Sequence, residues 1–450
     1  MRRVRKRGSV RGVSNLLIFL FLVFSGVASA QEVSLPQPGK PLSLNDCVGL
    51  ALRFNPALRS NQASVDAQKA RVEQALAAYY PQINFTANYN TATSNFATLG
   101  GTTVGVSRGQ YSWTFTDLFS MGPTLTQLIY DFGRTSNSVK INRENVNASE
   151  QDLVTTRQTV ILNVQQAYFG VLQGQRLVEV AKEIVTQTQQ HLEQAQGFYQ
   201  AGTRPKIDVT KAEVDLANAQ LALIQANNNF AVAQVTLNNA IGLTQSLTFP
   251  VEDTLGFAPR EYRLEDIVNT AYDQRPEILQ IKAKQRSQEA AVNLAQSSYY
   301  PILSGNASNL YRTNSVPNDL VWDWSVGLTL SIPLFTGFSS PSQVAEQRAN
   351  LKNLISQEEA LKLNIRLEAE QAYLSQKQAT EQVRVTEKAV GQAQENYELA
   401  SGRYQVGVGS PLEITDAEVQ LANAKANNIQ ALYNYKVAEA RIERAMGTNK

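Results

Sequence analysis

The side chains that most often perform chemistry are scarce in this sequence. Its 450 residues include one histidine, His191, and one cysteine, Cys47. Together they cannot supply the four ligands of a structural zinc site, and one cysteine cannot form an internal disulfide bond. His191 lies in a run of Gln and Glu residues, which predicts a solvated helix surface and not a general base. Cys47 lies in a helical pattern, where a small buried apolar side chain is expected. We expect no enzyme, metal site or cofactor.

A glycine-rich stretch, Leu99 to Gly109, is the other candidate for chemistry. Phosphate-binding loops of this kind precede a helix, because a helix N-terminus attracts an anion. This stretch precedes a strand pattern, which favours an extracellular loop. The chain has 41 Lys and Arg against 39 Asp and Glu, so no excess of basic residues predicts nucleic acid as a partner.

The first thirty residues resemble an export signal. Six basic residues are followed by an apolar run, Leu16 to Phe24, and by the small residues Ala28-Ser29-Ala30. A membrane anchor is the alternative, but the run is short, since a helix needs about 20 apolar residues to cross a bilayer. We expect residues 1–30 to be a secretory signal peptide. Gln31 follows the expected cleavage site, so a lipidated cysteine is not expected there.

The rest of the chain is a tandem duplication. Tyr79-Tyr80-Pro81 recurs as Tyr299-Tyr300-Pro301, at a spacing of 220 residues. Tyr199 to Gly202 recurs as Tyr404 to Gly407, at a spacing of 205. Self-similarity at this scale predicts two structural repeats. We place the first repeat at 31–243, a linker at 244–263 and the second repeat at 264–450.

Each repeat shows the same order of periodicities, which predicts a short helix, two strands, a long helix and a second short helix. The predicted helices are 43–78, 134–197, 207–241, 264–297, 341–401 and 412–446. The predicted strands are about 82–90, 111–130, 302–312 and 321–332. Two short helices stacked end to end would match one long helix at about 100 Å. The linker would then lie at mid-height.

The helix at 207–241 carries two apolar seams. Val209, Ala212, Leu216 and Ala219 begin a seam in which small and large residues alternate with a period near 3.5, as in a supercoil. A second seam lies on the opposite side and contains Val214, Ala217, Leu221, Ile224, Asn228, Ala231 and Val235. Two neighbours on opposite sides indicate one helix in the wall of a hollow tube. A solid antiparallel bundle is the alternative, although its helices usually show one wide apolar face.

The last predicted strand indicates a membrane. Trp322, Trp324 and Val326 open an alternation of apolar and polar residues about eleven residues long, typical of a tilted membrane strand. We expect Trp113, Trp322 and Trp324 in an interfacial aromatic girdle. Soluble sandwiches show the same alternation. Four strands cannot close a barrel, however, and lipid does not tolerate open sheet edges. We therefore expect an oligomer: eight strands need two chains and twelve need three.

The duplicated unit, its paired turns and the following Asp208-x-x-x-Ala212 and Glu413-x-x-x-Ala417 resemble the TolC family of outer-membrane efflux proteins. The resemblance spans residues 42 to 448. It implies a mainly α fold with membrane β-structure: a long periplasmic α-helical barrel joined to a 12-stranded outer-membrane β-barrel shared by a homotrimer. It also implies a periplasmic adaptor, an inner-membrane pump and a role as exit duct in tripartite efflux or type I secretion.

The resemblance further implies a gated periplasmic aperture. By position, polar links and acidic rings fall on Asp208, Tyr404, Glu413 and Asp416. Where the family pattern can carry a closing arginine, this chain has Gly409, and Arg204 occupies the equivalent place in the first repeat. Gly202 and Gly407 are expected to form the adaptor-facing turns. Solvated turn and cap residues are the alternative.

Two other functions stay open at this point. One is a helical periplasmic protein, structural or adaptor-like, without a pore. The other is a secreted pore-forming protein that inserts into foreign membranes. The sequence does not predict which substrate passes, because a duct selects little.

Overall fold

The structure, a computed structural model, describes residues 41–93, 115–243, 250–313 and 321–449. The predicted signal peptide and the predicted loop at 99–109 lie outside these ranges. The first repeat consists of α1 (Leu44–Phe54), α2 (Pro56–Leu76), η1 (Ala77–Tyr79), β1 (Gln82–Thr93), β2 (Phe115–Tyr130), α3 (Arg134–Gln200) and α4 (Lys206–Ile241). The second consists of α5 (Leu264–Gln274), α6 (Pro276–Gln296), η2 (Ser297–Tyr299), β3 (Ile302–Thr313), β4 (Val321–Ser331), α7 (Ser339–Gln405) and α8 (Pro411–Met446).

The two repeats match element by element, which confirms the predicted duplication. α3 and α7 have 67 residues each, and α4 and α8 have 36 each. At a rise of 1.5 Å per residue, each long helix measures about 100 Å. The prediction of one continuous helix at 43–78, and of another at 264–297, is wrong, because each region contains two helices.

Proline causes both breaks. Pro56 and Pro276 each occupy the first turn of the second helix, where a missing backbone N–H is tolerated. The residue before each proline, Asn55 or Arg275, is extended, as the proline ring requires. The Asn55 side chain accepts a hydrogen bond from the backbone N–H of Ala57 at 2.9 Å, so the new helix starts with a cap.

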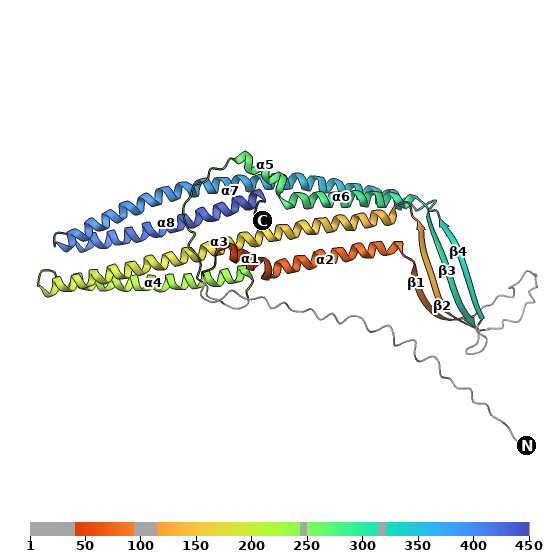
Figure 1. The fold of residues 1–450 in the computed structure, drawn as a ribbon, viewed down its shortest axis with the longest axis horizontal. Helices are drawn as coiled ribbons and strands as arrows, with labels where there is room; N and C mark the ends of the chain where they lie inside the picture. The colour runs from red at the N-terminus through yellow and green to blue at the C-terminus, as the bar shows by residue number, and fades with distance from the viewer. Residues whose placement is uncertain (1–40, 94–114, 244–249, 314–320, 450) are drawn as a thin grey trace, which may run out of the picture. The chain divides into compact units, whose positions relative to one another are not determined.

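The longer helices form a single layer (Figure 1), and α1 and α5 pack against it. Near the strands the neighbours follow the order α2, α3, α6, α7, and at the opposite end the order is α4, α3, α8, α7. α3 and α7 therefore run the full length, and the shorter helices fill the remaining places at either end. This arrangement agrees with the predicted wall.

The shorter helices meet end to end at two places, which we name the helix joints. At the first joint, the C-terminus of α4 meets the break between α1 and α2: Asn55 Nδ2 donates to the carbonyl oxygen of Ala240 at 3.0 Å. A Cβ on Gly242 would lie 2.8 Å from the Asn55 Cα. At the second joint, Gly447 meets the break between α5 and α6. A Cβ added to Gly447 would lie 3.1 Å from backbone atoms of Gln274. Both glycines have positive φ, so two constraints favour glycine there.

The segment 250–263 packs at the level of these joints. Leu42 forms an isolated parallel bridge with Val251. The hydroxyl of Tyr168 donates to the carbonyl oxygen of Glu252 at 2.6 Å, and that of Tyr435 donates to Ala258 at 2.6 Å. Each tyrosine belongs to one of the larger buried clusters. The described part of the predicted linker, residues 250–263, thus contacts both repeats.

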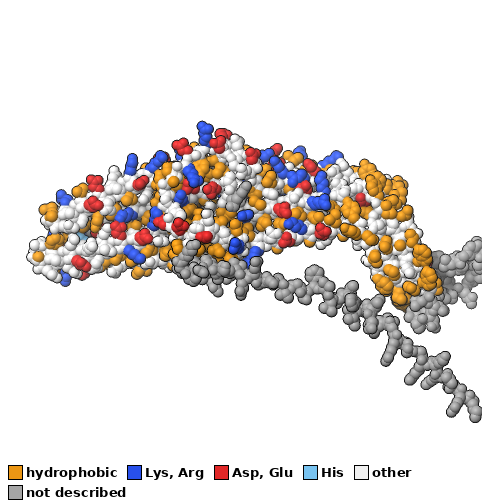
Figure 2. Space-filling view, in the orientation of Figure 1, with side chains coloured by type: hydrophobic (Ala, Val, Ile, Leu, Met, Phe, Trp, Pro, Cys, Tyr) orange, Lys and Arg blue, Asp and Glu red, His pale blue; other side chains and the backbone are white. Residues whose placement is uncertain are grey.

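The four strands form one antiparallel sheet in the order β1-β2-β3-β4. Trp324, Val326 and Leu328 of β4 pair with Asn309, Ala307 and Gly305 of β3, and they lie on one face with Ile83 and Phe85 of β1. The other face is polar: Asn306 donates to Thr329 at 3.0 Å, and the hydroxyls of Ser308 and Ser325 are 2.9 Å apart. Apolar side chains gather over the strands (Figure 2). The predicted two-faced sheet is confirmed, with β1 extending to Thr93.

Candidate functional site

Two helical turns mark the end of the molecule farthest from the strands (Figure 1). We name them tip 1 (201–205, between α3 and α4) and tip 2 (406–410, between α7 and α8). Gly202 has φ 72° and Gly407 has φ 80°, and nothing lies within 4 Å of where a Cβ would stand on either. Backbone conformation, and not crowding, is therefore the reason for glycine. Both were predicted as turn formers, and the structure confirms this. Their contact with an adaptor stays a prediction.

Arg204 connects the two tips. Its Nη2 donates to the carbonyl oxygen of Gly409 at 2.7 Å and lies 3.4 Å from that of Gly407. Its Nη1 is 3.9 Å from the Asp208 carboxylate, and its guanidinium lies over the ring of Tyr404 at 5.7 Å. One cation from tip 1 thus contacts the backbone of tip 2, an acid in the first turn of α4 and an aromatic ring.

Gly409 has no room for a side chain. A Cβ there would lie 2.7 Å from the backbone nitrogen of Tyr404 and 2.9 Å from the carbonyl carbon of Arg403. Its own N–H donates to the carbonyl oxygen of Arg403 at 2.8 Å and closes the turn tightly. An arginine at this position would not fit the observed turn. The cation comes instead from Arg204, at the equivalent position of the other repeat.

Tyr404 does not line an opening within the protomer, because its side chain is fully buried. Its ring lies 4.8 Å from the ring of His191 and 5.7 Å from that of Phe198, both on α3. Its hydroxyl has no hydrogen-bond partner in the part of the chain that the structure describes. Burial, and then Asp208, raise its pKa. Tyr404 thus joins α7 to α3, and a gating role for it stays a prediction.

The expectation of a solvated His191 is wrong. Its side chain is 4% exposed, because Tyr404 from the other repeat covers it. Its Nδ1 has no hydrogen-bond partner among the described residues. Burial lowers its pKa, so the neutral imidazole is favoured. The local sequence is polar, and only the long-range contact with α7 buries the ring.

The acidic residues of the tips differ in environment. Asp208 is half-buried beside Arg204, whereas Glu413 and Asp416 are exposed. Glu413 pairs with Arg403 within the second repeat at 3.4 Å. The structure therefore brings Asp208, Arg204 and Tyr404 together and leaves Asp416 free to face solvent. Their roles at an aperture stay predictions.

Sequence reasoning missed Glu418. This side chain is 3% exposed, and its Oε1 has no partner in the described structure. Burial, followed by the charge of Asp215, raises its pKa to about 7. The local pattern does not signal this burial, because Glu213 lies at the same spacing between Val209 and Leu216 and is exposed. Thr415 donates to Asp215 at 3.3 Å and brings α4 close to α8 here.

The aromatic residues of the sheet form two groups. Trp322 and Trp324 are exposed on the apolar face, near the loop end of β4. Trp113 lies outside the described residues. A second group, missed from sequence, surrounds the helix ends of the strands, and we name it the aromatic collar: Tyr79, Tyr80, Tyr130, Phe132, Tyr299, Tyr300, Phe335 and Phe338, all exposed. The repeated Tyr-Tyr-Pro was its signal.

Cys47 is fully buried, as predicted, and burial raises its pKa to about 12. Among the described residues, no group of three or more His, Cys, Asp or Glu side chains is placed to hold a metal ion. In the same ranges, no helix is both long and apolar enough to cross a membrane.

Comparison with known proteins agrees with this geometry. The model of the family "Outer membrane efflux protein" matches residues 47–243 and 267–448. Outer membrane protein TolC of Vibrio cholerae serotype O1 is 25% identical over 417 residues, covering 90% of this chain and 91% of that protein. Outer membrane efflux protein BepC of Brucella suis biovar 1 is 22% identical over 436 residues, covering 95% and 90%.

A solved structure shows the same fold. The CmeC outer membrane channel of Campylobacter jejuni superposes with a TM-score of 0.76 at 20% identity, covering 90% of this chain and 86% of that one. The family match spans both repeats, each with its long helix, its strand pair and its tip. The chain therefore belongs to the outer membrane efflux protein family and is an outer-membrane exit duct for an efflux or secretion system.

Proposed function

We propose that three copies of this chain form the channel. The observation that carries the proposal is the pair of unfinished edges of the protomer. β1 and β4 each pair with a single strand in the described sheet, and unpaired edges are not tolerated in lipid. An eight-stranded barrel would be filled by its own side chains. Twelve strands, four from each of three chains, close the sheet and leave a lumen lined by the polar face.

The helical edges support the same assembly. Four members of the predicted second seam of α4 are exposed, each by more than half: Val214, Leu221, Ile224 and Val235. α7, at the other edge, exposes an apolar stripe that includes Leu363, Leu367, Leu374, Val385 and Leu399. Burying one stripe against the other between neighbouring copies would remove both from water.

Assembly and conductance test this proposal. The purified chain is expected to have three times the chain mass by light scattering and to conduct ions in a planar bilayer. Ile224→Lys places a charge in the seam and should abolish the trimer. Asn227→Lys adds the same charge on the exposed flank of α4 and should leave it intact. A monomer, or a trimer without conductance, would overturn the proposal.

The tips are proposed as the contact with a periplasmic adaptor, which connects the duct to an inner-membrane pump. Besides Gly202 and Gly407, tip 2 exposes Val406 and Val408, and the first turns of α4 and α8 expose Ile207 and Leu412. Replacing Val406 and Val408 by Asp should abolish cross-linking to the adaptor without changing conductance. Unchanged cross-linking would contradict the assignment.

The proposed duct is passive: it uses no catalytic step and no cofactor, and it is not lipidated, since Gln31 and not Cys follows the expected cleavage site. The proposed aperture consists of Asp208, Glu413 and Asp416, with Arg204 and Tyr404 holding the tips. A structural or adaptor-like protein without a pore would not need a sheet with one apolar face.

A further inference from the structure

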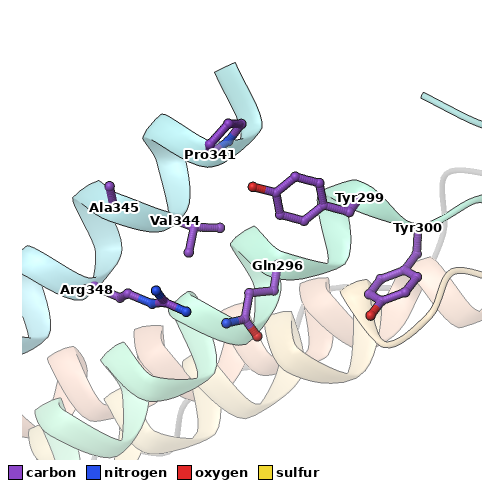
Figure 3. A pocket seen from close by; sticks show the side chains of 7 residues that line it. All are labelled: Gln296, Tyr299, Tyr300, Pro341, Val344, Ala345 and Arg348. Carbon is purple, nitrogen blue, oxygen red and sulfur yellow. The ribbon is translucent and has the colours of Figure 1, made fainter. Parts of the chain in front are cut away.

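A hollow lies where the helices meet the strands of the second repeat (Figure 3). It has a volume of about 430 Å³ and opens between the end of α6 and the start of α7. Its walls combine two kinds of side chain. Tyr299, Pro341 and Val344 supply apolar surface, and Arg348 and Gln296 supply polar groups.

The hollow is continuous with the apolar face of the sheet. The ring of Tyr300, which also lines it, stacks on Phe132 at 5.3 Å, and Phe132 meets Tyr130 at 4.7 Å. Tyr130 pairs with Leu303, which pairs with Leu330 on the apolar face of β4. The hollow therefore belongs to the aromatic collar, at the helix side of that face.

The collar lies at the depth of a headgroup layer. β4 has 11 residues, and a strand of that length tilted by about 40° rises roughly 25 Å, the height of the apolar band on outer-membrane barrels. With Trp322 and Trp324 at one boundary of the hydrocarbon, the collar stands at the other. Interfacial aromatic side chains occur at both boundaries of a membrane.

Arg348 has no partner of its own. In the ranges that the structure describes, its guanidinium makes no hydrogen bond or ion pair, and the same is true of the Gln296 amide and of the two tyrosine hydroxyls. By contrast, Arg286 on the same wall pairs with Glu144 at 2.9 Å. The hollow thus offers a cation and several hydrogen-bond donors that the protein does not use.

We propose that this hollow binds the phosphate of a glycerophospholipid in the membrane leaflet on the helix side, with Arg348 as its principal ligand. A guanidinium matches a phosphate with two parallel hydrogen bonds. The hydroxyl of Tyr299 and the amide of Gln296 are further donors at the rim. Pro341, Val344 and the tyrosine rings form the apolar surface on which the glycerol and the first acyl carbons lie.

The first repeat has an arginine at the position equivalent to Arg348, and this arginine could also bind lipid in the test. Arg143 stands at the position equivalent to Arg348, but Leu76 and Lys140 replace Gln296 and Ala345 there. All variants are therefore made in an Arg143→Gln background, so that only the hollow of the second repeat is measured. Lys352→Gln is the matched control, since Lys352 is exposed one turn farther from the membrane on the same face of α7.

The experiment is native mass spectrometry of the full chain in a nonionic detergent, titrated with short-chain phosphatidylglycerol. Arg348→Gln should weaken binding about tenfold, the effect of losing one charge-assisted contact. Arg348→Lys should recover part of that loss, and Lys352→Gln should bind as the parent does. Diacylglycerol with the same acyl chains should bind equally weakly to every variant.

Three outcomes would overturn the proposal. Arg348→Gln could bind as the parent does, Lys352→Gln could lose as much, or millimolar inorganic phosphate could displace the lipid completely and mark the site as one for a free anion. The proposal rests on the position of the sheet in the outer membrane. Conductance of each variant in a planar bilayer tests that position separately.

Discussion

Arg204 binds the backbone of its own counterpart: its guanidinium donates at 2.7 Å to the carbonyl oxygen of Gly409, the residue at the equivalent position of the second repeat. The duplication has become asymmetric here. One copy keeps a long cationic side chain, and the other has no side chain that could obstruct it. The contact connects tip 1 to tip 2 and so couples the two helical pairs at their far ends.

Arg204→Gln should loosen the tips. A hydrogen bond to a charged group contributes about 1.5–3 kcal/mol, so its loss is expected to favour separation of the tips by at least tenfold. The measurement is the resting conductance of single channels in a planar bilayer, which should rise. Arg403→Gln is the control, because Arg403 pairs with Glu413 inside one repeat. An equal rise in both variants would refute a special role for the contact between repeats.

Gly409→Ala should also raise the resting conductance. The new Cβ would stand 2.7 Å from the Tyr404 nitrogen, so the turn must shift and carry the carbonyl away from Arg204. We expect a raised resting conductance that is not raised further by adding Arg204→Gln. Gly391 lies in α7, where nothing stands within 4 Å of a new Cβ, so Gly391→Ala should leave the conductance unchanged. Additive effects of the two tip variants would show that they act separately.

Replacing Asp208 and Asp416 by Ala should weaken cation selectivity. Negative charges around a narrow opening concentrate cations and repel anions. Asp416 is exposed while Asp208 is beside Arg204, so the single Asp416 variant should account for most of the change. Reversal potentials in asymmetric KCl measure it. Asp266→Ala removes an exposed charge far from the tips and serves as the control. Identical reversal potentials in all variants would contradict the proposed acidic aperture.

Glu418→Gln should stabilise the protein at alkaline pH. Burial and Asp215 raise the pKa of Glu418 from 4.5 to about 7. Between these values the unfolded chain has lost the proton that the folded chain retains, so the free energy of unfolding falls as pH rises and stays low above pH 7. The variant should gain up to about 3 kcal/mol at pH 8 and almost nothing at pH 4.5. Thermal unfolding at pH 8 and pH 4.5 tests this, with the exposed Glu413→Gln as the control. If Glu418→Gln and the parent protein unfold alike at both pH values, the prediction is wrong.

His191→Phe should reduce sensitivity to acid. Burial lowers the pKa of His191 below 6.5, so the unfolded chain binds a proton that the folded chain does not, and stability falls as pH drops below 6.5. Phenylalanine retains an aromatic ring against Tyr404 and has no proton to bind. The comparison is made in the Glu418→Gln background, because Glu418 titrates with the opposite sign. His191 is the only histidine of the chain. If His191→Phe leaves the acid sensitivity unchanged, that sensitivity comes from other groups.

The sequence was sufficient for features that repeat or alternate locally. The duplication, the two-faced strands and the glycines of the tips follow from spacing and from backbone preference, and the structure contains all of them. The breaks at Pro56 and Pro276 were also visible locally, but the surrounding helical periodicity outweighed them in the prediction.

Contacts between the repeats were not predictable in this way. His191 and Tyr404 are more than 200 residues apart, and only the packing of α3 against α8 and its partner α7 brings their rings together. Arg204 finds a backbone carbonyl, which carries no side-chain signal at all. Glu418 is buried while its repeat equivalent, Glu213, is exposed, so identical residues in matched helices have different environments.

The helix joints have a mechanical consequence. Across their level only α3 and α7 are covalently continuous, while the other two places in the wall change from one helix to another. Bending stiffness depends on continuous backbone hydrogen bonding, so it is lowest at that level. The layer of helices therefore bends most easily at this level, about the two helices that pass through it unbroken. The second joint is braced by Arg275, which pairs with Glu368 at 2.6 Å, whereas the equivalent residue at the first joint is the neutral Asn55. The pivot is therefore stiffer in one repeat than in the other, and flexing of the first-repeat side is the softer deformation.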